Sequence, residues 1–455
     1  MYTFVVLFML MKGTESSECT CDYGSKTIIC SGLRLRALQG NTAFCGLARK
    51  IDLSQNYIRK FPGDIHQFLF VDLSRNSLED LNVSSVHKVK ELNVSTNILT
   101  VINLRNLFLS LTGLDASKNN LGLLNDDFLQ GHCNILQLDI SDNKIVSLQS
   151  IARCQQLIAL IAARNIITKV TDDLLLLTKL KLLNLSENKL KIIANLPVSL
   201  EMLNLSWNKL AWMSSLTLIG LQSLKVLHLE KNEMNFIRDG MFANLSSLST
   251  LNMNDNNISF LYKNSFIGLR AVKKLQLRHN FIEYVSNMTF SDLPALEELY
   301  LDWNLLTSLP ALRLGRNVKR VSITLNLIKQ VDLPALLTML PEDSGSREVF
   351  FLVNNIRGDD IEWPKIMQHF DWQCVPEWVV PTEELISDAM AEDRIYTLAR
   401  AECPCVRFFQ DDRAFGTCIS SEGVVLGMPW LQAAQLMATL EEEPGGSVVI
   451  VKDEL

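Results

Sequence analysis

Residues Leu180–Leu190, "LKLLNLSENKL", and their near copy Leu200–Leu210, "LEMLNLSWNKL", share the pattern L-x-x-L-x-L-x-x-N-x-L. The pattern recurs in thirteen turns, and the asparagines that mark the turns lie 20 to 24 residues apart. A period of this length is typical of a repeat architecture in which each unit packs on its neighbours. The marking residues are Asn56, Asn76, Asn97, Asn119, Asn143, Asn165, Asn188, Asn208, Asn232, Asn256, Asn280, Asn304 and Asn326.

The apolar and polar positions of each turn have separate roles. Successive side chains of a strand point to opposite faces, so Leu183 and Leu185 point inward while Asn184 between them points to solvent. The marking asparagine carries both donors and an acceptor. We expect it to satisfy backbone groups left open where the chain bends, and to stack as a ladder along the array. A single turn cannot bury its leucines, so stacked turns share one core with capped ends.

These repeats resemble the leucine-rich repeat family, and the resemblance covers about Leu47 to Ile328, with a degenerate further turn at Glu348–Ile356, "EVFFLVNNI". It implies an α/β solenoid: a leucine-rich repeat horseshoe with a parallel concave β-sheet, a disulfide-containing N-terminal cap and a mixed, partly helical C-terminal region. The predicted organisation is a signal peptide at 1–17, the cysteine cap at 18–46, repeats at 47–358 and an acidic, cysteine-containing region at 359–455.

The ten cysteines form three even groups, which favours disulfide pairing within each group. No C-x-x-C is present and the six histidines lack metal-ligand spacing, so an oxidising compartment explains the cysteines better than a metal site. The first group resembles the cysteine cap of the family, and its pairing is left open. The middle pair, at nearly equivalent places in adjacent turns, is either a bridge between turns or two buried free thiols. The groups are Cys19, Cys21, Cys30 and Cys45; Cys133 and Cys154; and Cys374, Cys403, Cys405 and Cys418.

Both ends of the sequence carry features of secretory targeting. The uncharged run Phe4–Met11 has the length of a signal-peptide core and is too short to span a bilayer. No Lys or Arg precedes it, so the alternative is a buried N-terminal strand. The last four residues, Lys452, Asp453, Glu454 and Leu455, match the tetrapeptide that the retrieval receptor of the endoplasmic reticulum reads. We therefore expect a chain of the secretory pathway without a transmembrane span. It would lie in the lumen of the endoplasmic reticulum if the retrieval signal is read, and would otherwise be secreted.

The C-terminal region differs in composition from the repeats. From Pro376 onward it has 15 acidic and 5 basic residues, within a chain whose net charge is −7. Residues 382–401 and 429–443 have helical periodicity, and 359–374 is a candidate for a helix that closes the solenoid. The simplest interpretation of the acidic composition is a solvated cap surface.

The sequence contains no catalytic motif of the H-E-x-x-H, G-x-S-x-G, G-x-G-x-x-G or phosphate-binding-loop type. A leucine-rich solenoid offers an extended curved surface that suits binding. We therefore expect no enzymatic activity, no cofactor, no metal and no nucleic-acid partner. By resemblance, secreted members of the family recognise proteins, glycans or pathogen products on the concave strand face or its edges.

The outward positions of that face lie six, four and two residues before each marking asparagine. The early turns carry the default of the family there, as in Asp52-Leu-Ser54, Asp72-Leu-Ser74 and Asp139-Ile-Ser141. The later turns alternate in charge and include aromatic residues, which are enriched at interface centres, although an ordinary mixed-charge surface is the alternative. The predicted ligand-binding residues are Lys274, Gln276, Arg278, Glu298, Tyr300, Asp302, Trp303 and Arg320, with His279 beside them.

A second candidate surface lies in the middle of the array, where Ala159, Ile161, Ala163, Leu182 and Met202 are predicted to point outward. Two glycosylation sequons fall on the same face, so glycans there would cover it. The seven candidate glycosylation sites are Asn82, Asn93, Asn184, Asn204, Asn244, Asn257 and Asn287.

Two functions fit these features. The first is a non-enzymatic protein-binding module of the secretory pathway with its protein or glycan ligand on the concave face. The general layout, with no heptads, resembles arthropod leucine-rich immune proteins that lack a coiled coil, which implies innate-immune recognition. The second is a resident client-binding or assembly factor of the endoplasmic reticulum, which the acidic tail and the retrieval tetrapeptide favour. An enzyme housed in the tail has no motif behind it.

Overall fold

The structure is a computed structural model in which the chain forms two compact units, Met1–Ile161 and Ala162–Leu455. We call them the N-terminal unit and the C-terminal unit. The described residues are 18–38, 45–46, 48–62, 65, 67–81, 88–102, 110–122, 124, 133–328 and 333–339, together with short strands between 348 and 452. The predicted signal peptide at 1–17 lies outside them.

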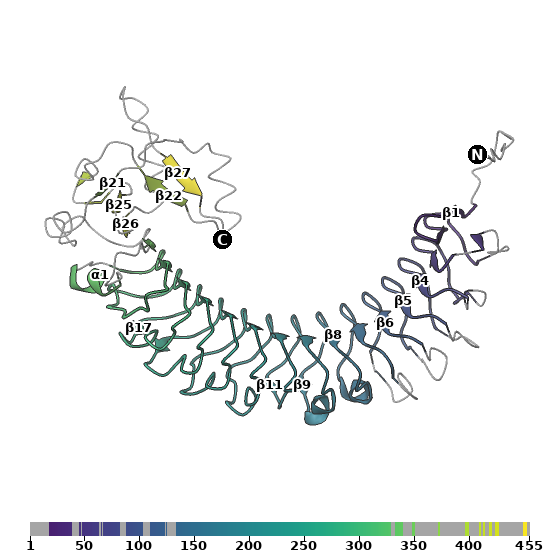
Figure 1. The fold of residues 1–455 in the computed structure, drawn as a ribbon, viewed down its shortest axis with the longest axis horizontal. Coiled ribbons are helices and arrows are strands. Elements are labelled where there is room, and N and C mark those ends of the chain that lie inside the picture. Colours follow the sequence, from purple (N-terminus) through teal and green to yellow (C-terminus); the bar gives the residue numbers. More distant parts are fainter. Residues whose placement is uncertain are drawn as a thin grey trace, which may run out of the picture. The chain divides into compact units, whose positions relative to one another are not determined.

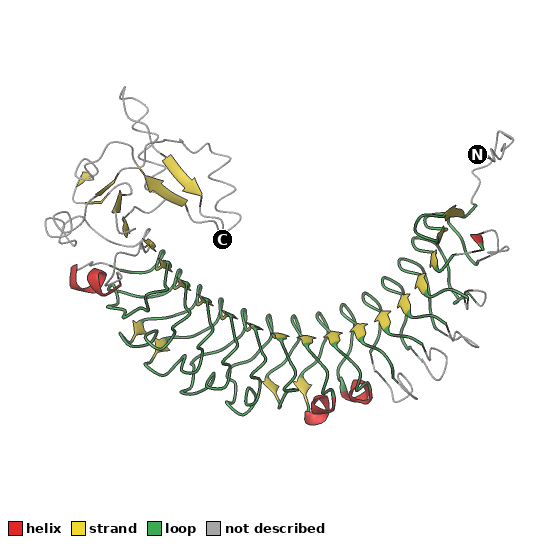
Figure 2. Cartoon of the chain, in the orientation of Figure 1, coloured by secondary structure: helices red, strands yellow, loops and turns green. Residues whose placement is uncertain are grey.

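The N-terminal unit is a stack of turns, each contributing one three-residue strand to a sheet (Figures 1 and 2). Strands β2 to β8 pair in parallel, each with the next, and β1 pairs antiparallel with β2. One 3₁₀ helix, Gln149–Arg153, follows β7. The strands are β1 (Thr20–Asp22), β2 (Thr27–Ile29), β3 (Lys50–Asp52), β4 (Phe70–Asp72), β5 (Glu91–Asn93), β6 (Gly113–Asp115), β7 (Gln137–Asp139) and β8 (Ala159–Ile161).

The C-terminal unit continues the same pattern with one parallel sheet on its inner side and two short two-stranded sheets on its outer side (Figure 1). The inner strands are β10 (Leu182–Asn184), β12 (Met202–Asn204), β13 (Val226–His228), β14 (Thr250–Asn252), β16 (Lys274–Gln276), β18 (Glu298–Tyr300), β19 (Arg320–Ser322) and β20 (Glu348–Phe350). The outer strands are β9 (Lys169–Val170) with β11 (Ile192–Ile193), and β15 (Phe260–Leu261) with β17 (Tyr284–Val285). The unit also contains a 3₁₀ helix, Asp172–Leu176, and the helix α1, Leu333–Met339.

The degenerate repeat predicted at Glu348–Ile356 contributes a strand, because β20 pairs in parallel with β19. Beyond it, the described segments are all strands. The helix predicted over 382–401 is wrong at Tyr396–Ala399, where a run of β-compatible residues pairs antiparallel with Val449–Lys452. Trp372–Gln373, within the candidate closing helix, is likewise a strand. The strands are β21 (Trp372–Gln373), β22 (Tyr396–Ala399), β23 (Phe409–Gln410), β24 (Arg413–Ala414), β25 (Cys418–Ser420), β26 (Val424–Leu426) and β27 (Val449–Lys452).

The core of each unit is a column of leucines supplied by successive turns. Leu183 and Leu185 are fully buried and Asn184 between them is half-buried, which confirms the predicted alternation. Farther round the turn, Phe242, Phe266 and Phe290 stack with ring centroids 6.2 and 5.8 Å apart. Burial of such side chains contributes roughly 1.5–3 kcal/mol each, so the stack rather than any single turn supplies the stability.

The marking asparagines form the predicted ladder inside each unit. The Asn208 Nδ2 group donates to the carbonyl of Leu185 in the preceding turn at 2.9 Å and to that of Leu205 in its own turn at 3.1 Å. Its Oδ1 atom accepts from the backbone N–H of Leu190 at 3.0 Å. One buried side chain thus satisfies donors and acceptors of two turns, which would otherwise be buried without partners.

The residue before each marking asparagine bends the chain out of its strand. All thirteen such residues have left-handed φ angles between 50° and 57°. Trp207 and Trp303 are among them, although this region is uncommon for residues other than glycine, asparagine and aspartate. The repeat imposes this conformation at one place in every turn.

The predicted cysteine cap begins the N-terminal unit. The structure pairs Cys19 with Cys30 and Cys21 with Cys45, which resolves the connectivity that the sequence left open. These bridges hold the β1–β2 hairpin, whose Ile28 is fully buried at the start of the core. Cys133 and Cys154 also form a disulfide, so the middle cysteines bridge adjacent turns. Cys374, Cys403 and Cys405 lie outside the described residues.

The ladder predicts a large cost for removing one asparagine amide. Asn208→Leu should lower the free energy of unfolding by about 2–4 kcal/mol, because it leaves several buried backbone groups without partners. Lys209→Ala, at the exposed neighbouring residue, is the matched control and should change stability by less than about 0.5 kcal/mol. Chemical denaturation followed by circular dichroism measures both. Equal stability of the two variants would show that the ladder is dispensable.

Candidate ligand-binding groove

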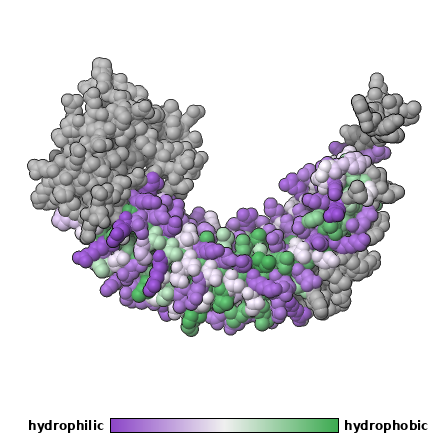
Figure 3. Space-filling model, in the orientation of Figure 1, coloured by the Kyte–Doolittle hydropathy of each residue, from purple (hydrophilic) through white to green (hydrophobic). Residues whose placement is uncertain are grey.

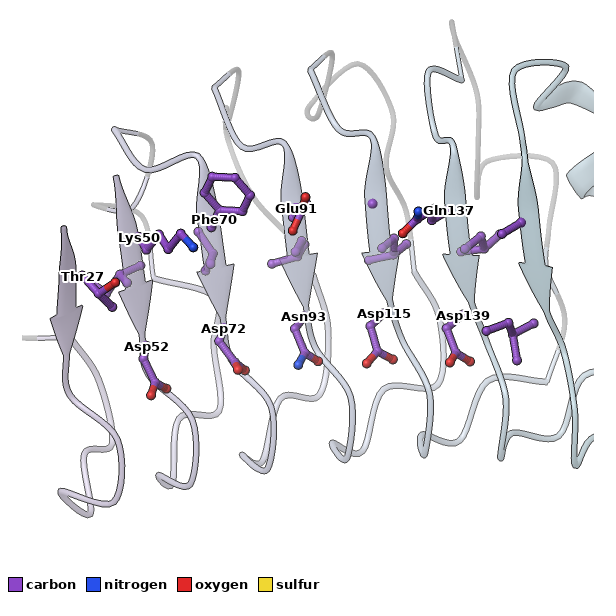
Figure 4. A pocket seen from close by; sticks show the side chains of 18 residues that line it. Thr27, Lys50, Asp52, Phe70, Asp72, Glu91, Asn93, Asp115, Gln137 and Asp139 are labelled. Carbon is purple, nitrogen blue, oxygen red and sulfur yellow. The ribbon is translucent and has the colours of Figure 1, made fainter. Parts of the chain in front are cut away.

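The strand face of the N-terminal unit carries a groove of about 580 Å³. It runs across β2 to β8, so every wall residue comes from a strand of that sheet. Each three-residue strand buries its middle side chain and presents its first and third side chains to the groove. The lining therefore consists of two rows that follow the strand register (Figure 4).

The row at the carboxyl ends of the strands is acidic, and we call it the acidic row. Strand register places Asp52 beside Asp72, Asp72 beside Asn93, Asn93 beside Asp115 and Asp115 beside Asp139. Neighbouring strands lie about 4.8 Å apart, so the side chains form an evenly spaced line. Figure 4 shows them side by side and pointing in the same direction.

Each member of the acidic row is held by its own backbone. The Oδ1 atom of Asp72 accepts from the N–H of Ser74 at 2.8 Å, and Asp115 accepts from Ser117 at 3.0 Å. Equivalent bonds fix Asp52, Asn93 and Asp139. One oxygen of each aspartate is used in this way, and none of the four carboxylates forms an ion pair within the described residues.

The charges of the acidic row are mutually unfavourable. Two carboxylates about 5 Å apart repel by about 1 kcal/mol in water and by more where water is partly excluded. Burial raises the pKa of Asp139, and the nearby carboxylates of Asp115 and Asp142 raise it further, against hydrogen bonds from Ser141 that lower it. The neutral Asn93 separates the row into two pairs. A bound cation would relieve this repulsion.

The second row is varied and includes a glycine. Its members are Thr27, Lys50, Phe70, Glu91, Gly113, Gln137 and Ala159, the first residues of β2 to β8. The Lys50 ammonium lies 4.9 Å from the centre of the Phe70 ring. Gly113 has no side chain to fill the groove, and a Cβ placed there would lie 3.2 Å from Cγ of Glu91. The Glu91 side chain therefore lies against the space that a side chain at position 113 would occupy.

The eight residues predicted to bind ligand, which we call the late cluster, lie together in the C-terminal unit. Register places Lys274 beside Glu298 and Glu298 beside Arg320, while Gln276 lies beside Tyr300. The predicted exposure is wrong for three members, because Arg278, Tyr300 and Asp302 are buried. Lys274 and Glu298 remain partly exposed and form an ion pair at 3.4 Å.

The buried members of the late cluster bind one another. Arg278 Nε donates to Asp302 Oδ2 at 2.8 Å, and the guanidinium lies 4.0 Å from the centre of the Tyr300 ring. Asp302 Oδ1 also accepts from Ser322 Oγ and from the N–H of Thr324, the latter at 2.9 Å. Asp302 thus links three turns, and its capacity for hydrogen bonds is used within the fold.

Tyr300 is also occupied by its neighbours. Its hydroxyl donates to Glu298 Oε2 at 2.9 Å. Burial raises the pKa of Tyr300 to about 12, and the bond to Glu298 also raises it. The exposed aromatic of the late cluster is Trp303, whose ring stacks on His279 with centroids 5.0 Å apart. The late cluster therefore mainly joins neighbouring turns, with Trp303 exposed at its surface and four members half-buried there: Lys274, Gln276, Glu298 and Arg320.

The second predicted surface, in the middle of the array, is also less exposed than predicted. Ala163 is buried and was wrongly predicted to point outward, whereas Met202 is exposed and Ala159, Ile161 and Leu182 are half-buried. Asn184 and Asn204 are half-buried, and each accepts from the N–H of the serine two residues later.

The remaining candidate glycosylation sites and the C-terminal tetrapeptide differ in their exposure and in whether the structure describes them. Asn244, Asn257 and Asn287 are exposed, Asn93 is half-buried on β5, and Asn82 lies outside the described residues. Lys452 is the last residue of β27, paired with Tyr396, and 453–455 lie outside the described residues. None of the described helices is both long and apolar enough to cross a bilayer.

Sequence reasoning missed the groove although its residues were visible. Asp52, Asp72 and Asp139 match the default of the repeat, and the backbone bonds from the following serines support that role. The signal that was available is their recurrence at the same position in neighbouring turns, together with a glycine at 113.

Comparison of the chain with known proteins supports the repeat fold described above. A family model described as "Leucine rich repeat" matches residues 199–258, 222–280 and 254–306. The fold is a leucine-rich repeat solenoid of parallel strands with few helices. Among curated proteins, no relative matches the chain.

Solved structures with the same fold include two at low sequence identity. A leucine-rich repeat protein of Leptospira interrogans is 23% identical with a TM-score of 0.58, over 74% of this chain and 92% of that one. Toll, in the Toll–Spatzle complex of Drosophila, is 20% identical with a TM-score of 0.59, over 71% of this chain and 46% of that one. These similarities concern the fold.

The late cluster generates a stability prediction. Asp302→Ala should lower the free energy of unfolding by about 3 kcal/mol, because it leaves the buried Arg278 without its carboxylate and Thr324 without its acceptor. Asp292→Ala, at an exposed acid in the same turn, should cost less than about 0.5 kcal/mol. Denaturant unfolding of both variants gives the comparison. An Asp302→Ala cost no larger than that of the control would mean that the tie between turns carries no stability.

Proposed function

We propose that the protein is a non-enzymatic recognition module that binds a protein ligand in the groove of its N-terminal unit. The observation that carries this proposal is the acidic row, four carboxylates and one amide aligned in an open groove, with no ion pair to neutralise them among the described residues. The fold itself does not require this charge, since other turns place Ile161 or His228 at the same position.

The chemistry of the groove selects a cationic segment of that ligand. Lysine or arginine side chains placed along the row would relieve the mutual repulsion of the aspartates and pair with the oxygens that the backbone leaves unused. Gly113 adds no side chain of its own to the second row, and the Phe70 ring beside Lys50 offers an apolar surface for an apolar side chain of the ligand. A segment that crosses the strands and alternates basic and apolar side chains fits both rows.

The compartment we propose is the secretory route or the cell exterior. Three disulfides within the N-terminal unit support it, since such bonds persist in oxidising compartments. The exposed sequons Asn244, Asn257 and Asn287 fit glycosylation there. Asn93 lies in the groove, so we infer that it is unmodified in the form that binds ligand.

Innate-immune recognition is the finer proposal. It rests on the layout that resembles arthropod leucine-rich immune proteins and on the similarity of fold to Toll. The Toll structure is that of a complex with Spatzle, described as a hub in Drosophila development and innate immunity. A protein ligand for the present chain is the corresponding expectation.

The groove can be tested with two fluorescent peptides of equal length, one alternating lysine and leucine and one alternating glutamate and leucine. The wild-type chain should bind the lysine peptide more tightly, and added salt should weaken this binding because the attraction is partly exposed. The double variant Asp72→Asn with Asp115→Asn should bind it at least about 10-fold more weakly. Gly113→Phe should block the groove, and Phe70 shows that the equivalent position of another turn accepts an aromatic ring.

The matched control removes two exposed carboxylates away from the groove, Glu79→Gln with Glu233→Gln. It has the same net charge as the groove double variant and should bind like the wild type. Fluorescence anisotropy gives the affinities, and circular dichroism checks the fold. Equal binding of the two peptides, or equal losses in both double variants, would contradict the proposed groove.

A resident factor of the endoplasmic reticulum is the second candidate, because residues Lys452–Leu455 match the retrieval tetrapeptide. Mass spectrometry of the mature protein first establishes whether its carboxyl terminus is Leu455. If it is, deletion of Leu455 should move the protein to the medium and make its glycans resistant to endoglycosidase H. Substitution of Ser447 by Ala is the control. Quantitative secretion of the unaltered chain at low expression would refute retention and leave the secreted module.

A further inference from the structure

The outer side of the C-terminal unit carries a continuous row of exposed apolar side chains. Each member lies four residues after a marking asparagine, in five consecutive turns, and each is between 40% and 56% exposed. We call this row the apolar stripe. Its members are Ile192, Trp212, Phe236, Phe260 and Tyr284.

The register of the turns aligns the apolar stripe. Strands β15 and β17 pair Phe260 directly with Tyr284, and the next residue of each, Leu261 or Val285, is buried. The Arg238 guanidinium lies 5.3 Å from the centre of the Trp212 ring and 5.4 Å from that of the Phe236 ring, so one side chain contacts both rings. Figure 1 places β11 and β17 on the outer side of the unit, and Figure 3 shows hydrophobic side chains at the surface there.

The repeat does not require apolar residues at this position. The turns on either side of the stripe carry Lys169 and Ser308 there, and both are exposed. In the N-terminal unit the same position is Lys60, Asp80 or Ser147 in three turns, and Val101 or Leu123 in the other two. A contiguous apolar surface of this kind, with aromatic residues in the majority, is typical of a protein interface.

We propose that the apolar stripe is the interface of a homodimer with two-fold symmetry. In a two-fold interface the same patch meets itself, so the patch must be self-complementary. An axis through Phe236 places Ile192 against Tyr284 of the second copy, and Trp212 against its Phe260. The stripe meets an equally apolar stripe in reversed order.

The charges beside the apolar stripe have the same symmetry. Lys191 precedes Ile192 at one end and Glu283 precedes Tyr284 at the other, and both are exposed. The axis through Phe236 brings Lys191 of one copy to Glu283 of the other, twice in the dimer. A reversed pattern of this kind identifies a second copy as the occupant.

The area that the apolar stripe can bury is large enough for a homodimer. Aromatic side chains present about 150–250 Å² each, so five side chains that are about half exposed contribute roughly 500 Å² per copy, or about 1,000 Å² in the dimer. Tyr262, whose ring stacks on Phe260 with centroids 6.3 Å apart, extends the patch. The total reaches the size at which specific interfaces begin.

Analytical ultracentrifugation of the full glycosylated chain, at about 1–50 μM, tests the proposal. The wild type should dimerise, and Phe236→Asp should weaken the dimer by at least about 30-fold, as expected for the centre of an interface. Lys191→Glu and Glu283→Lys should each weaken it, whereas the two together should restore it to within about 3-fold of the wild type. Leu216→Ser, at a more exposed apolar residue outside the stripe, should leave dimerisation unchanged.

Restoration by the paired charge reversal keeps the test independent of folding, because a misfolded variant cannot regain affinity. The glycosylated chain is used because Asn257, in the turn of Phe260, is a sequon. A wild type that stays monomeric over this range would overturn the proposal and leave the stripe to a different protein. A dimer that survives Phe236→Asp, or charge reversals that fail to compensate, would overturn it as well.

Discussion

The structure depends on one buried amide in each turn. An asparagine such as Asn208 donates to carbonyls of its own turn and of the preceding turn, and accepts from a backbone N–H of the preceding turn. Because these groups are buried, the spacing between turns is set by hydrogen bonds that cannot be exchanged for water. The leucines supply the hydrophobic driving force, and the asparagine supplies the alignment.

Alignment has a consequence for the surface. When neighbouring turns share one register, the same sequence position produces a row of side chains about 4.8 Å apart along the unit. The acidic row of the N-terminal unit and the apolar stripe of the C-terminal unit are two such rows, at different positions of the turn. In this architecture a binding surface consists of the side chains at one repeat position in successive turns. It is best recognised by comparing the residues at that position between turns.

The sequence predicted the repeating strands, the inward leucines and the role of the asparagines because these follow from periodicity and hydrogen-bonding capacity. It did not predict that Arg278, Tyr300 and Asp302 are buried, because their contacts join residues 22 or 24 apart in the sequence that only a folded stack brings together. The position two residues before the asparagine lies against the next turn, and so Asp302 is bonded laterally instead of facing solvent. The disulfide pairs also needed the fold, since spacing alone left their connectivity open.

Both rows are energetically unfavourable in the chain without a partner. This distinguishes them from features that the fold itself requires. The aspartates repel one another, and burial and its neighbours raise the pKa of Asp139. The apolar stripe holds Trp212 and Phe260 in water, where the hydrophobic effect disfavours them. The repeat tolerates other residues at both positions, as Ile161, His228, Lys169 and Ser308 demonstrate. A feature that the fold does not require, and that is unfavourable until something covers it, is best explained by the partner that covers it.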